Sequence, residues 1–564
     1  MGMVRKTGWR TAVAAIGVVM GVLAPWRAAA APRPRPKLIV ILVVDQMRAD
    51  YFDRYSQQWS AGLKRLMDQG AWFRLAAYPY LNTVTCPGHA TISTGAFPQT
   101  HGIPLNEWWD RTEARLVPCT EDLRSPLVSY GPPVKGGESP WALRVPTLAD
   151  ELRVQLPIVP RVVTVSLKAR SSVILAGRRA DASTWFDDEG VWGTSAAFAK
   201  APVPVVQRVL AAHPMERELD AVWTRTLPPE AYLFEDAGVG ERPPPGWTST
   251  FPHPLNFPEA PATGGARFER WDRSPYADEY LAWIAEAAVD ELKLGQGAGL
   301  DYLAVSFSAL DRVGHRFGPR SHEVQDTLVR LDRTIARLLD HLDRAVGHDR
   351  YVVALTADHG VAPIAEQTQA QGLAAGRLSA QKAADAVNAA IEPYLGTGKH
   401  VARMVYTDLY FAPGVYERLQ AKPEALRAAI DALLKIEGVS QVYRKEDLVR
   451  GVETFDPSRR AAALSYVADR SGDLIIVPQP YYYLSSDATT HGTAYQYDAR
   501  VPVFLAGLGI KPGEYLSAAT PADIAPTLAF LAGIELSASE GRVLAEALAP
   551  PPPSTPAAST APRR

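Results

Sequence analysis

The chain has 564 residues, a formal net charge of −2 and 47% hydrophobic residues. A chain with this near-neutral charge lacks the excess of basic residues that marks a nucleic-acid-binding surface, so we expect no such surface. The chain has only 2 cysteines, which are too few for a thiolate zinc site and allow at most one internal disulfide. Any metal site must therefore use histidine and carboxylate ligands.

The N-terminal segment 1–31 has the pattern of a secretory signal peptide. Basic residues precede an apolar run over 11–26, and small residues follow at 28–31. The alternative is a membrane anchor, but the run is shorter than the ~20 residues that span a bilayer. We therefore expect cleavage, no stable membrane anchor, and a periplasmic or secreted protein.

Five apolar, β-branched runs predict buried strands. They are Leu38–Val44, Val162–Leu167, Leu303–Phe307, Tyr351–Leu355 and Val501–Leu505. Helical patterns lie between or after them, including Tyr280–Leu292, His322–Leu342 and Asp523–Leu531. This alternation indicates an α/β fold with a mostly parallel central sheet that helices cover on both faces.

Two stretches interrupt the alternation. Residues 180–275, approximately, are rich in proline, tryptophan and turns, and residues 365–480 contain helices and short strands of their own. We interpret both as inserted cap subdomains of one catalytic domain over 32–548, and expect the first to shape access for the leaving group. Residues 549–564 are mostly Pro, Ala, Ser and Thr, which predicts a disordered tail.

Three aspartates and three histidines lie close to the ends of predicted strands: Asp45, Asp311, His315, Asp358, His359 and His491. Each alone is explained by a turn, a helix cap or a helix face. Ligands of open α/β sheets bind beyond the carboxyl ends of the strands, where all six could meet. Carboxylate and imidazole ligands without thiolates indicate two zinc-like cations.

The segment 82–95 contains a candidate nucleophile. Pro87 suits the first turn of a helix, which puts Thr85 near the helix N-cap. The free N–H groups and positive dipole end there would stabilise an alkoxide and an incoming anion. Taken alone, however, the segment favours a simple helix cap, because caps are common.

Together these motifs resemble the alkaline phosphatase superfamily, and within it the PafA-like bacterial alkaline phosphatases that use a threonine nucleophile. The residues that carry the resemblance are Asp45, Thr85-Cys-Pro-Gly-His, Asp311-x-x-x-His315, Asp358-His359-Gly360 and His491-Gly492-x-x-Tyr-x-Tyr-Asp. The resemblance covers about 38 to 548. It implies a phosphate monoesterase in which Thr85 forms a covalent phospho-threonine intermediate.

The same resemblance implies two zinc ions. One would bind Asp45, Asp358, His359 and the oxygen of Thr85, and the other would bind Asp311, His315 and His491. Among the remaining histidines, His89 and His101 flank the candidate nucleophile and are expected to be structural. Cys86 and Cys119 could form a disulfide, which their spacing permits without establishing it.

Three further residues bear on the substrate. In an extended segment, Lys168 and Arg170 would point to the same side and could face one ligand, and Asn106 could add an amide donor. These groups suit the dianion of a phosphate monoester better than a diester. The resemblance places matching positions on the phosphoryl oxygens; the simpler alternative for Lys168 and Arg170 is a solvated strand end.

Small phosphate esters are thus the expected substrates. A phosphodiesterase or nucleotide pyrophosphatase remains the alternative enzyme, because it shares the metal and threonine motifs. A small-anion-binding protein without chemistry is the alternative outside enzymes, and the presence of Thr85 beside all six ligands speaks against it. The sulfatase nucleophile motif Cys-x-Pro-x-Arg is absent around Cys86.

Overall fold

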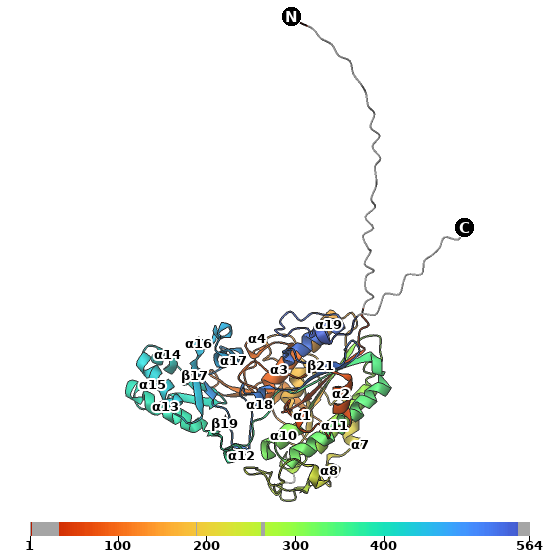
Figure 1. Ribbon diagram of the computed structural model, residues 1–564, viewed down its shortest axis with the longest axis horizontal. Helices are drawn as coiled ribbons and strands as arrows, with labels where there is room; N and C mark the ends of the chain where they lie inside the picture. The colour runs from red at the N-terminus through yellow and green to blue at the C-terminus, as the bar shows by residue number, and fades with distance from the viewer. Residues whose placement is uncertain (1, 3–32, 188, 261–264, 551–564) are drawn as a thin grey trace, which may run out of the picture. The chain divides into compact units, whose positions relative to one another are not determined.

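A mixed sheet of 11 strands lies at the centre of the part of the chain that the structure describes (Figure 1). The structure is a computed structural model that describes residue 2 and residues 33–187, 189–260 and 265–550. The predicted signal peptide over 1–31 and the predicted tail over 549–564 fall outside these residues, except at 2, 549 and 550.

Five parallel strands form the middle of this sheet. In spatial order they are β13 (Tyr351–Thr356), β1 (Leu38–Val44), β12 (Asp301–Phe307), β7 (Val162–Ser166) and β8 (Ala182–Phe186). Antiparallel pairings extend it on one side through β20 (Val503–Gly507), β2 (Ala71–Phe73) and β21 (Gly513–Tyr515), of which β21 is parallel to β2. On the other side follow β9 (Trp192–Ser195), β5 (Glu121–Ser129) and β6 (Gly137–Glu138). The predicted α/β fold is confirmed, with its parallel part confined to the centre.

The last predicted strand, β20, runs antiparallel to its neighbour β13. Val503 at its start pairs with Thr356 at the end of β13. A residue that precedes β20 therefore reaches the same sheet edge as residues that follow the parallel strands. This direction explains how His491, which precedes β20, can approach candidate ligands that follow the parallel strands, such as Asp45 and Asp358.

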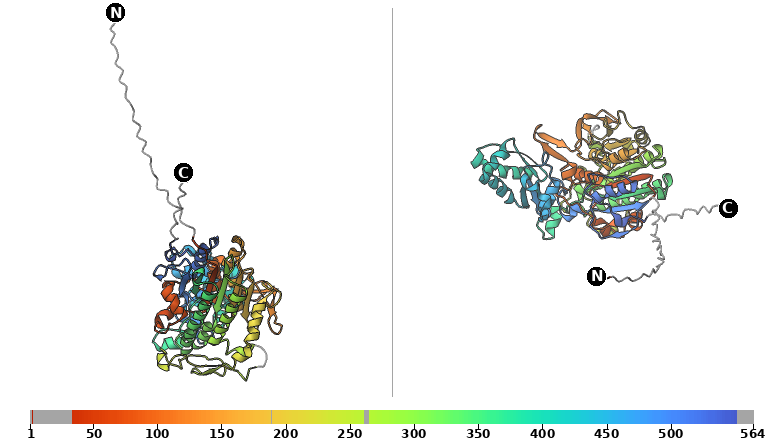
Figure 2. Two further views of the ribbon diagram at one scale, coloured as in Figure 1. Left: turned by 90° about the vertical axis from the view of Figure 1, so that its right-hand side faces the viewer. Right: turned by 90° about the horizontal axis from the view of Figure 1, so that it is seen from above.

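Helices cover both faces of the sheet, as the views in Figure 2 show. Alternate residues of β1 point to opposite sides, so Leu38, Val40 and Leu42 join one hydrophobic core and Ile39 and Ile41 join another. The first core includes helices α9 (Pro275–Glu291) and α11 (His322–Ala345). The second includes α5 (Leu148–Gln155) and α19 (Ile524–Ala532). Burial on both faces explains why β1 is a continuous apolar run.

The chain forms further helices before, between and after these elements. They are α1 (Tyr51–Arg54), α2 (Gly62–Gln69), α3 (Thr85–Thr94), α4 (Pro98–His101), α6 (Ala169–Ala176), α7 (Pro204–Ala212), α8 (Met215–Glu218), α10 (Ala309–Phe317), α12 (Ala365–Ala370), α16 (Lys445–Leu448), α17 (Pro457–Ser465) and α18 (Gln496–Ala499). Three of them, α3, α6 and α10, carry candidate site residues and are described below.

The stretch 180–275 begins inside the central sheet, because β8 and β9 are strands of that sheet. After them come α7 and a short antiparallel pair of β10 (Val222–Trp223) and β11 (His253–Pro254). Trp223, Trp247 and Trp271 from this stretch are buried in the same core as α9 and α11. These tryptophans join the stretch to the helical layer on that face.

The stretch 365–480 contains a sheet of its own. Its strands, in spatial order, are β15 (Val401–Val405), β16 (Asp408–Phe411), β18 (Leu474–Pro478) and β17 (Val439–Arg444), all antiparallel. Helices α13 (Ala380–Leu395), α14 (Val415–Gln420) and α15 (Pro423–Leu434) pack on it around a separate hydrophobic core. We call residues 376–484 the second-sheet subdomain; β14 (Gly376–Leu378) and β19 (Tyr482–Leu484) pair at its boundaries.

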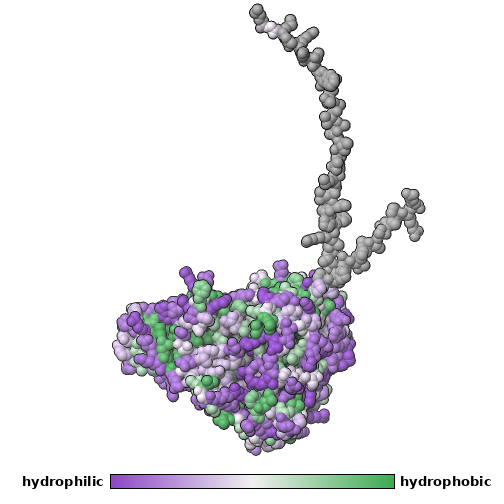
Figure 3. Space-filling model, viewed as in Figure 1, coloured by the Kyte–Doolittle hydropathy of each residue, from purple (hydrophilic) through white to green (hydrophobic). Residues whose placement is uncertain are grey.

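Within the described residues, none of the helices is both long enough and apolar enough to cross a membrane. Figure 3 shows one face of the molecule, on which hydrophilic residues predominate and hydrophobic ones form small groups. Such scattered apolar groups are ordinary on protein surfaces.

Candidate active site

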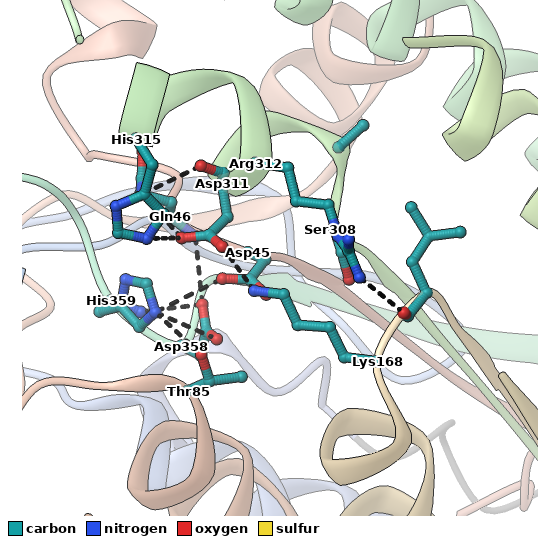
Figure 4. A network of polar contacts seen from close by, with 12 residues as sticks. Asp45, Gln46, Thr85, Lys168, Ser308, Asp311, Arg312, His315, Asp358 and His359 are labelled. Atoms are coloured by element: carbon teal, nitrogen blue, oxygen red, sulfur yellow. Dashed lines mark hydrogen bonds and ion pairs between the residues drawn. The ribbon is translucent and has the colours of Figure 1, made fainter. Parts of the chain in front are cut away.

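Four neighbouring strands each deliver a charged residue to one edge of the sheet. Asp358 follows β13, Asp45 follows β1, and Lys168 follows β7. After β12 the chain enters α10, whose first turn carries Asp311 and whose next turn carries His315. Figure 4 shows these side chains turned toward one another. The order of the strands therefore determines the order of the charges.

The first group of candidate metal ligands is Asp45, Asp358 and His359, as predicted. One ligand atom from each lies within 4.8 Å of the other two. His359 Nε2 is 3.4 Å from Asp45 Oδ1 and 3.5 Å from Asp358 Oδ2. Thr85 Oγ1 lies 3.5 Å from the same nitrogen, so the candidate nucleophile borders this group.

The second group centres on Asp311. Its Oδ1 is 3.2 Å from His315 Nε2 and 3.7 Å from His491 Nε2, the two predicted partners. Asp311, His491 and His359 also have one ligand atom each within 4.8 Å of the other two. The rings of His359 and His491 stack with centroids 3.5 Å apart. The two groups are therefore contiguous, and His359 lies between them.

The three histidines present the same nitrogen to the carboxylates. Nδ1 of His359, His315 and His491 lies 2.9 Å from the carbonyl oxygens of Gly360, Thr489 and Thr83, respectively. Each Nδ1–H therefore donates to a backbone carbonyl, and each Nε2 keeps its lone pair. This second contact is the usual way in which a protein orients a metal-binding imidazole.

The charges of the site are unbalanced without a cation. Asp45 Oδ1 and Asp358 Oδ2 are buried and accept no hydrogen bond from the described part of the chain. Burial raises the pKa of Asp45 well above its ordinary value, and repulsion from Asp311 and Asp358 raises it further. Burial also opposes ionisation of Asp311, but Lys168 and His315 hold its pKa well below the usual range. Unpartnered carboxylate oxygens beside imidazole lone pairs fit bound metal ions.

Thr85 is the first residue of α3, and Val84, not Thr85, is the N-cap. Thr85 therefore lies next to the N-cap and Pro87 lies in the first helical turn, as predicted. Because the N-cap is Val84, Thr85 is not the capping residue, which argues against the simple-cap interpretation. Its hydroxyl instead approaches His359 and lies at the wall of a cleft.

This cleft has a volume of about 410 Å³. Its inner wall includes Thr85, Asn106, Arg170 and Asp311, and the second-sheet subdomain contributes Arg403, Met404, Tyr406 and Leu484 to the outer wall. None of the described lining residues comes from 180–275. The expectation that this first stretch shapes access stays a prediction. The second-sheet subdomain is the part that lines the cleft, because its β15–β16 turn reaches it.

Lys168 and Arg170 occupy different surroundings. The extended segment predicted for them is wrong, because α6 starts at Ala169 and Lys168 is its N-cap. Lys168 Nζ lies 2.5 Å from Asp45 Oδ2 and 2.5 Å from Asp311 Oδ2, and so bridges the two ligand groups. Arg170, in the first helical turn, lines the cleft instead.

A disulfide joins Cys86 to Cys119 and holds Asn106 next to the nucleophile segment. The Cys86 N–H donates to Asn106 Oδ1 at 2.7 Å, and the Cys119 N–H donates to the Asn106 carbonyl at 2.8 Å. The pairing that the sequence permitted is therefore formed. Asn106 lies in the loop that this disulfide closes, just before the hairpin of β3 (Glu107–Asp110) and β4 (Arg115–Pro118).

Two further residues contact the candidate ligands, and the sequence analysis assigned neither of them such a role. Gln46 has a φ of 70° and donates from Nε2 to Asp311 Oδ1 at 2.7 Å, while its N–H donates to Asp358 Oδ1 at 3.2 Å. His89, expected to be structural, lies beneath Thr85 with Nδ1 3.3 Å from Asp358 Oδ2. Gln46 is signalled only by its place next to Asp45, whereas His89 is the last residue of the Thr85-Cys-Pro-Gly-His motif.

Comparisons with known proteins agree with this geometry. Residues 39–499 match the family described as type I phosphodiesterase / nucleotide pyrophosphatase. Alkaline phosphatase PafA of Elizabethkingia meningoseptica is 31% identical over 544 residues, which are 94% of this chain and 97% of that protein. Alkaline phosphatase PhoV of Synechococcus elongatus is also 31% identical, over 91% of this chain and 93% of its own. A crystal structure of PafA superposes with a TM-score of 0.85 at 30% identity, covering 92% of this chain and all of that one.

The chain belongs to the type I phosphodiesterase / nucleotide pyrophosphatase family of the alkaline phosphatase superfamily. Relatives of about 31% identity over most of the chain include several alkaline phosphatases, and the protein is a phosphoric monoester hydrolase.

Helix α3 approaches the end of β13 so closely that Gly88 has no room for a side chain. A Cβ at this position would lie 2.3 Å from the Asp358 carbonyl oxygen and 2.6 Å from Asp358 Cβ. Alanine usually stabilises a helix relative to glycine by ~1 kcal/mol. We predict the opposite for Gly88→Ala: a lower melting temperature and at least a tenfold loss of phosphatase activity, because overpacking displaces Asp358.

The matched control is Gly297→Ala, at an exposed glycine with open space around its Cβ position. Thermal unfolding and hydrolysis of p-nitrophenyl phosphate measure both variants. Wild-type activity and stability in Gly88→Ala would contradict the close approach.

Proposed function

We propose that the protein is an exported, two-zinc alkaline phosphatase that hydrolyses phosphate monoesters through a phospho-threonine at Thr85. The observation that carries this proposal is the position of the Thr85 hydroxyl, which lies between a cleft and a buried group of metal-type ligands. The ligand groups are Asp45, Asp358 and His359, and Asp311, His315 and His491. Bound zinc would lower the pKa of a coordinated hydroxyl or water and stabilise charge on phosphoryl and leaving oxygens.

The reaction assigns defined tasks to this chain's own atoms. Thr85 Oγ1 loses its proton to solvent and attacks phosphorus, and the bond from phosphorus to the leaving oxygen breaks with its electron pair on that oxygen. Water then attacks the phospho-threonine, releases phosphate and returns the proton to Thr85. The positive dipole end of α3 favours an incoming anion beside Thr85, while the Cys86 N–H at this end is already used by Asn106 Oδ1.

Three donors suit the dianion of a monoester. Arg170 and Asn106 line the cleft with Thr85. Lys168 has three N–H donors, of which two are used by Asp45 and Asp311, so one remains for a phosphoryl oxygen. A diester carries a second organic group where these donors would bind, and it gains less from them.

Export is supported by the disulfide between Cys86 and Cys119, because disulfides form and persist in oxidising compartments. The proposed location is the periplasm or the medium, and the proposed partners are small phosphate esters. The alternative activity is phosphodiester or nucleotide pyrophosphate hydrolysis, which the description of the matching family favours.

For the metals, we predict two zinc ions per chain, one for each ligand group. Chelation should abolish hydrolysis of p-nitrophenyl phosphate, and added zinc should restore it. Asp45→Asn should lower the zinc content measured by mass spectrometry, because a neutral amide binds zinc weakly. The control is Asp332→Asn, a buried carboxylate that accepts three backbone N–H bonds outside the site. Full zinc content in Asp45→Asn would remove that residue from the ligand set.

For the nucleophile, we predict that Thr85→Ala loses turnover by at least a factor of 1,000 while its zinc content is preserved, on the order expected for a lost nucleophile. Acid-quenched wild-type enzyme should carry a phosphoryl group on the peptide that contains Thr85. Thr94→Ala, at the far end of the same helix, should be phosphorylated like the wild type. Substantial covalent phosphorylation of Thr85→Ala would refute the assignment.

For substrate class, we predict that Arg170→Ala lowers kcat/KM for p-nitrophenyl phosphate about 100-fold more than for its bis-ester, as loss of one aligned donor suggests. The double variant Lys168→Ala with Arg170→Ala should widen this difference. Arg170 tests the idea more cleanly, because Lys168 also binds Asp45 and Asp311. Equal losses on both substrates, or faster wild-type hydrolysis of the bis-ester, would favour the phosphodiesterase alternative.

A further inference from the structure

The turn between β15 and β16 carries the second-sheet subdomain into the cleft. Tyr406 lies in this turn, lines the cleft together with Thr85, and has a φ of 49°. A left-handed backbone is unfavourable for a tyrosine. Such conformations persist where surrounding contacts fix them, and they are frequent at functional sites.

Contacts hold this turn against two other segments, one that precedes Thr85 and one that follows His491. Thr407 Oγ1 donates to Asn82 Oδ1 at 2.8 Å. The Tyr406 ring lies beside Gly492: a Cβ added to this glycine would be 3.9 Å from Tyr406 Cδ1. Tyr406 therefore lies between the segment before Thr85 and the residue after His491.

The hydroxyl of Tyr406 meets the side chain of Asn106. Asn106 Nδ2 donates to the Tyr406 hydroxyl oxygen at 3.2 Å, and Asn106 Oδ1 accepts from the Cys86 N–H at 2.7 Å. The two ends of one amide are therefore fixed by two different parts of the molecule. An asparagine amide otherwise has broad freedom about its last torsion. Because Nδ2 carries two hydrogens, one remains free to point into the cleft.

We propose that Tyr406 is a positioning residue that fixes the amide of Asn106 toward the phosphoryl group of a monoester. The inference rests on the proposed function, in which Asn106 donates to a phosphoryl oxygen. Tyr406 acts through Asn106 and takes no part in bond making. Through it, the second-sheet subdomain becomes part of the phosphoryl-binding site as well as a wall for the leaving group.

A double-mutant cycle tests this coupling, with Tyr406→Phe, Asn106→Ala and the combined variant assayed as zinc-loaded protein. We expect Tyr406→Phe to lower kcat/KM for p-nitrophenyl phosphate about 10-fold, as for the loss of one hydrogen bond. The loss on the bis-ester should be under about 2-fold, because that substrate gains little from the amide. In the Asn106→Ala background, Tyr406→Phe should have no further effect.

The matched control is Tyr410→Phe, which removes a hydroxyl that donates to the Arg470 carbonyl at 2.8 Å in the same small sheet. Tyr410→Phe should leave the monoester-to-diester ratio unchanged, which separates positioning from general support of the subdomain. The inference would be overturned, and the proposed function left intact, by either of two results. One is a loss in the combined variant equal to the product of the two single losses, and the other is wild-type kinetics for Tyr406→Phe. Full monoester activity in Asn106→Ala would overturn the proposed role of Asn106, and this inference with it.

Discussion

Crowding of negative charge at one edge of the sheet is the constraint on which the site depends. Asp45, Asp311 and Asp358 are all buried there, and the Lys168 ammonium contacts two of them. Like charges in a low-dielectric interior repel strongly. Further positive charge stabilises such an arrangement, so the carboxylates, the imidazoles and the candidate nucleophile Thr85 belong to one electrostatic unit. The surrounding fold serves to hold these groups together despite their repulsion.

The central strands and the grouping of the candidate ligands could largely be predicted from the amino-acid sequence alone. The apolar runs gave β1 its observed bounds and the others theirs to within two residues. Because parallel strands place their carboxyl ends together, Asp45 and Asp358 could be grouped without coordinates. His491 could be grouped too, although the reason, an antiparallel β20, became clear only from strand pairing.

What could not be predicted depends on contacts between distant segments. The bridging position of Lys168 follows from the start of α6, and periodicity does not locate a helix start to one residue. Gln46 contributes through a left-handed backbone that its residue type does not signal. The part played by the second-sheet subdomain depends on where a turn near residue 406 docks, and no local pattern encodes docking.

The second-sheet subdomain has a hydrophobic core separate from the two cores that flank the central sheet. Its outer-wall residues Arg403 and Leu484 therefore rest on a different hydrophobic core from those that flank the sheet with the candidate metal ligands. In the proposed phosphatase, substitutions of these two residues would change which alcohols leave readily, while the central sheet still supports the carboxylates and imidazoles. Outside the Tyr406 turn, this wall gives evolution, or an engineer, a place to alter leaving-group preference apart from the candidate metal ligands.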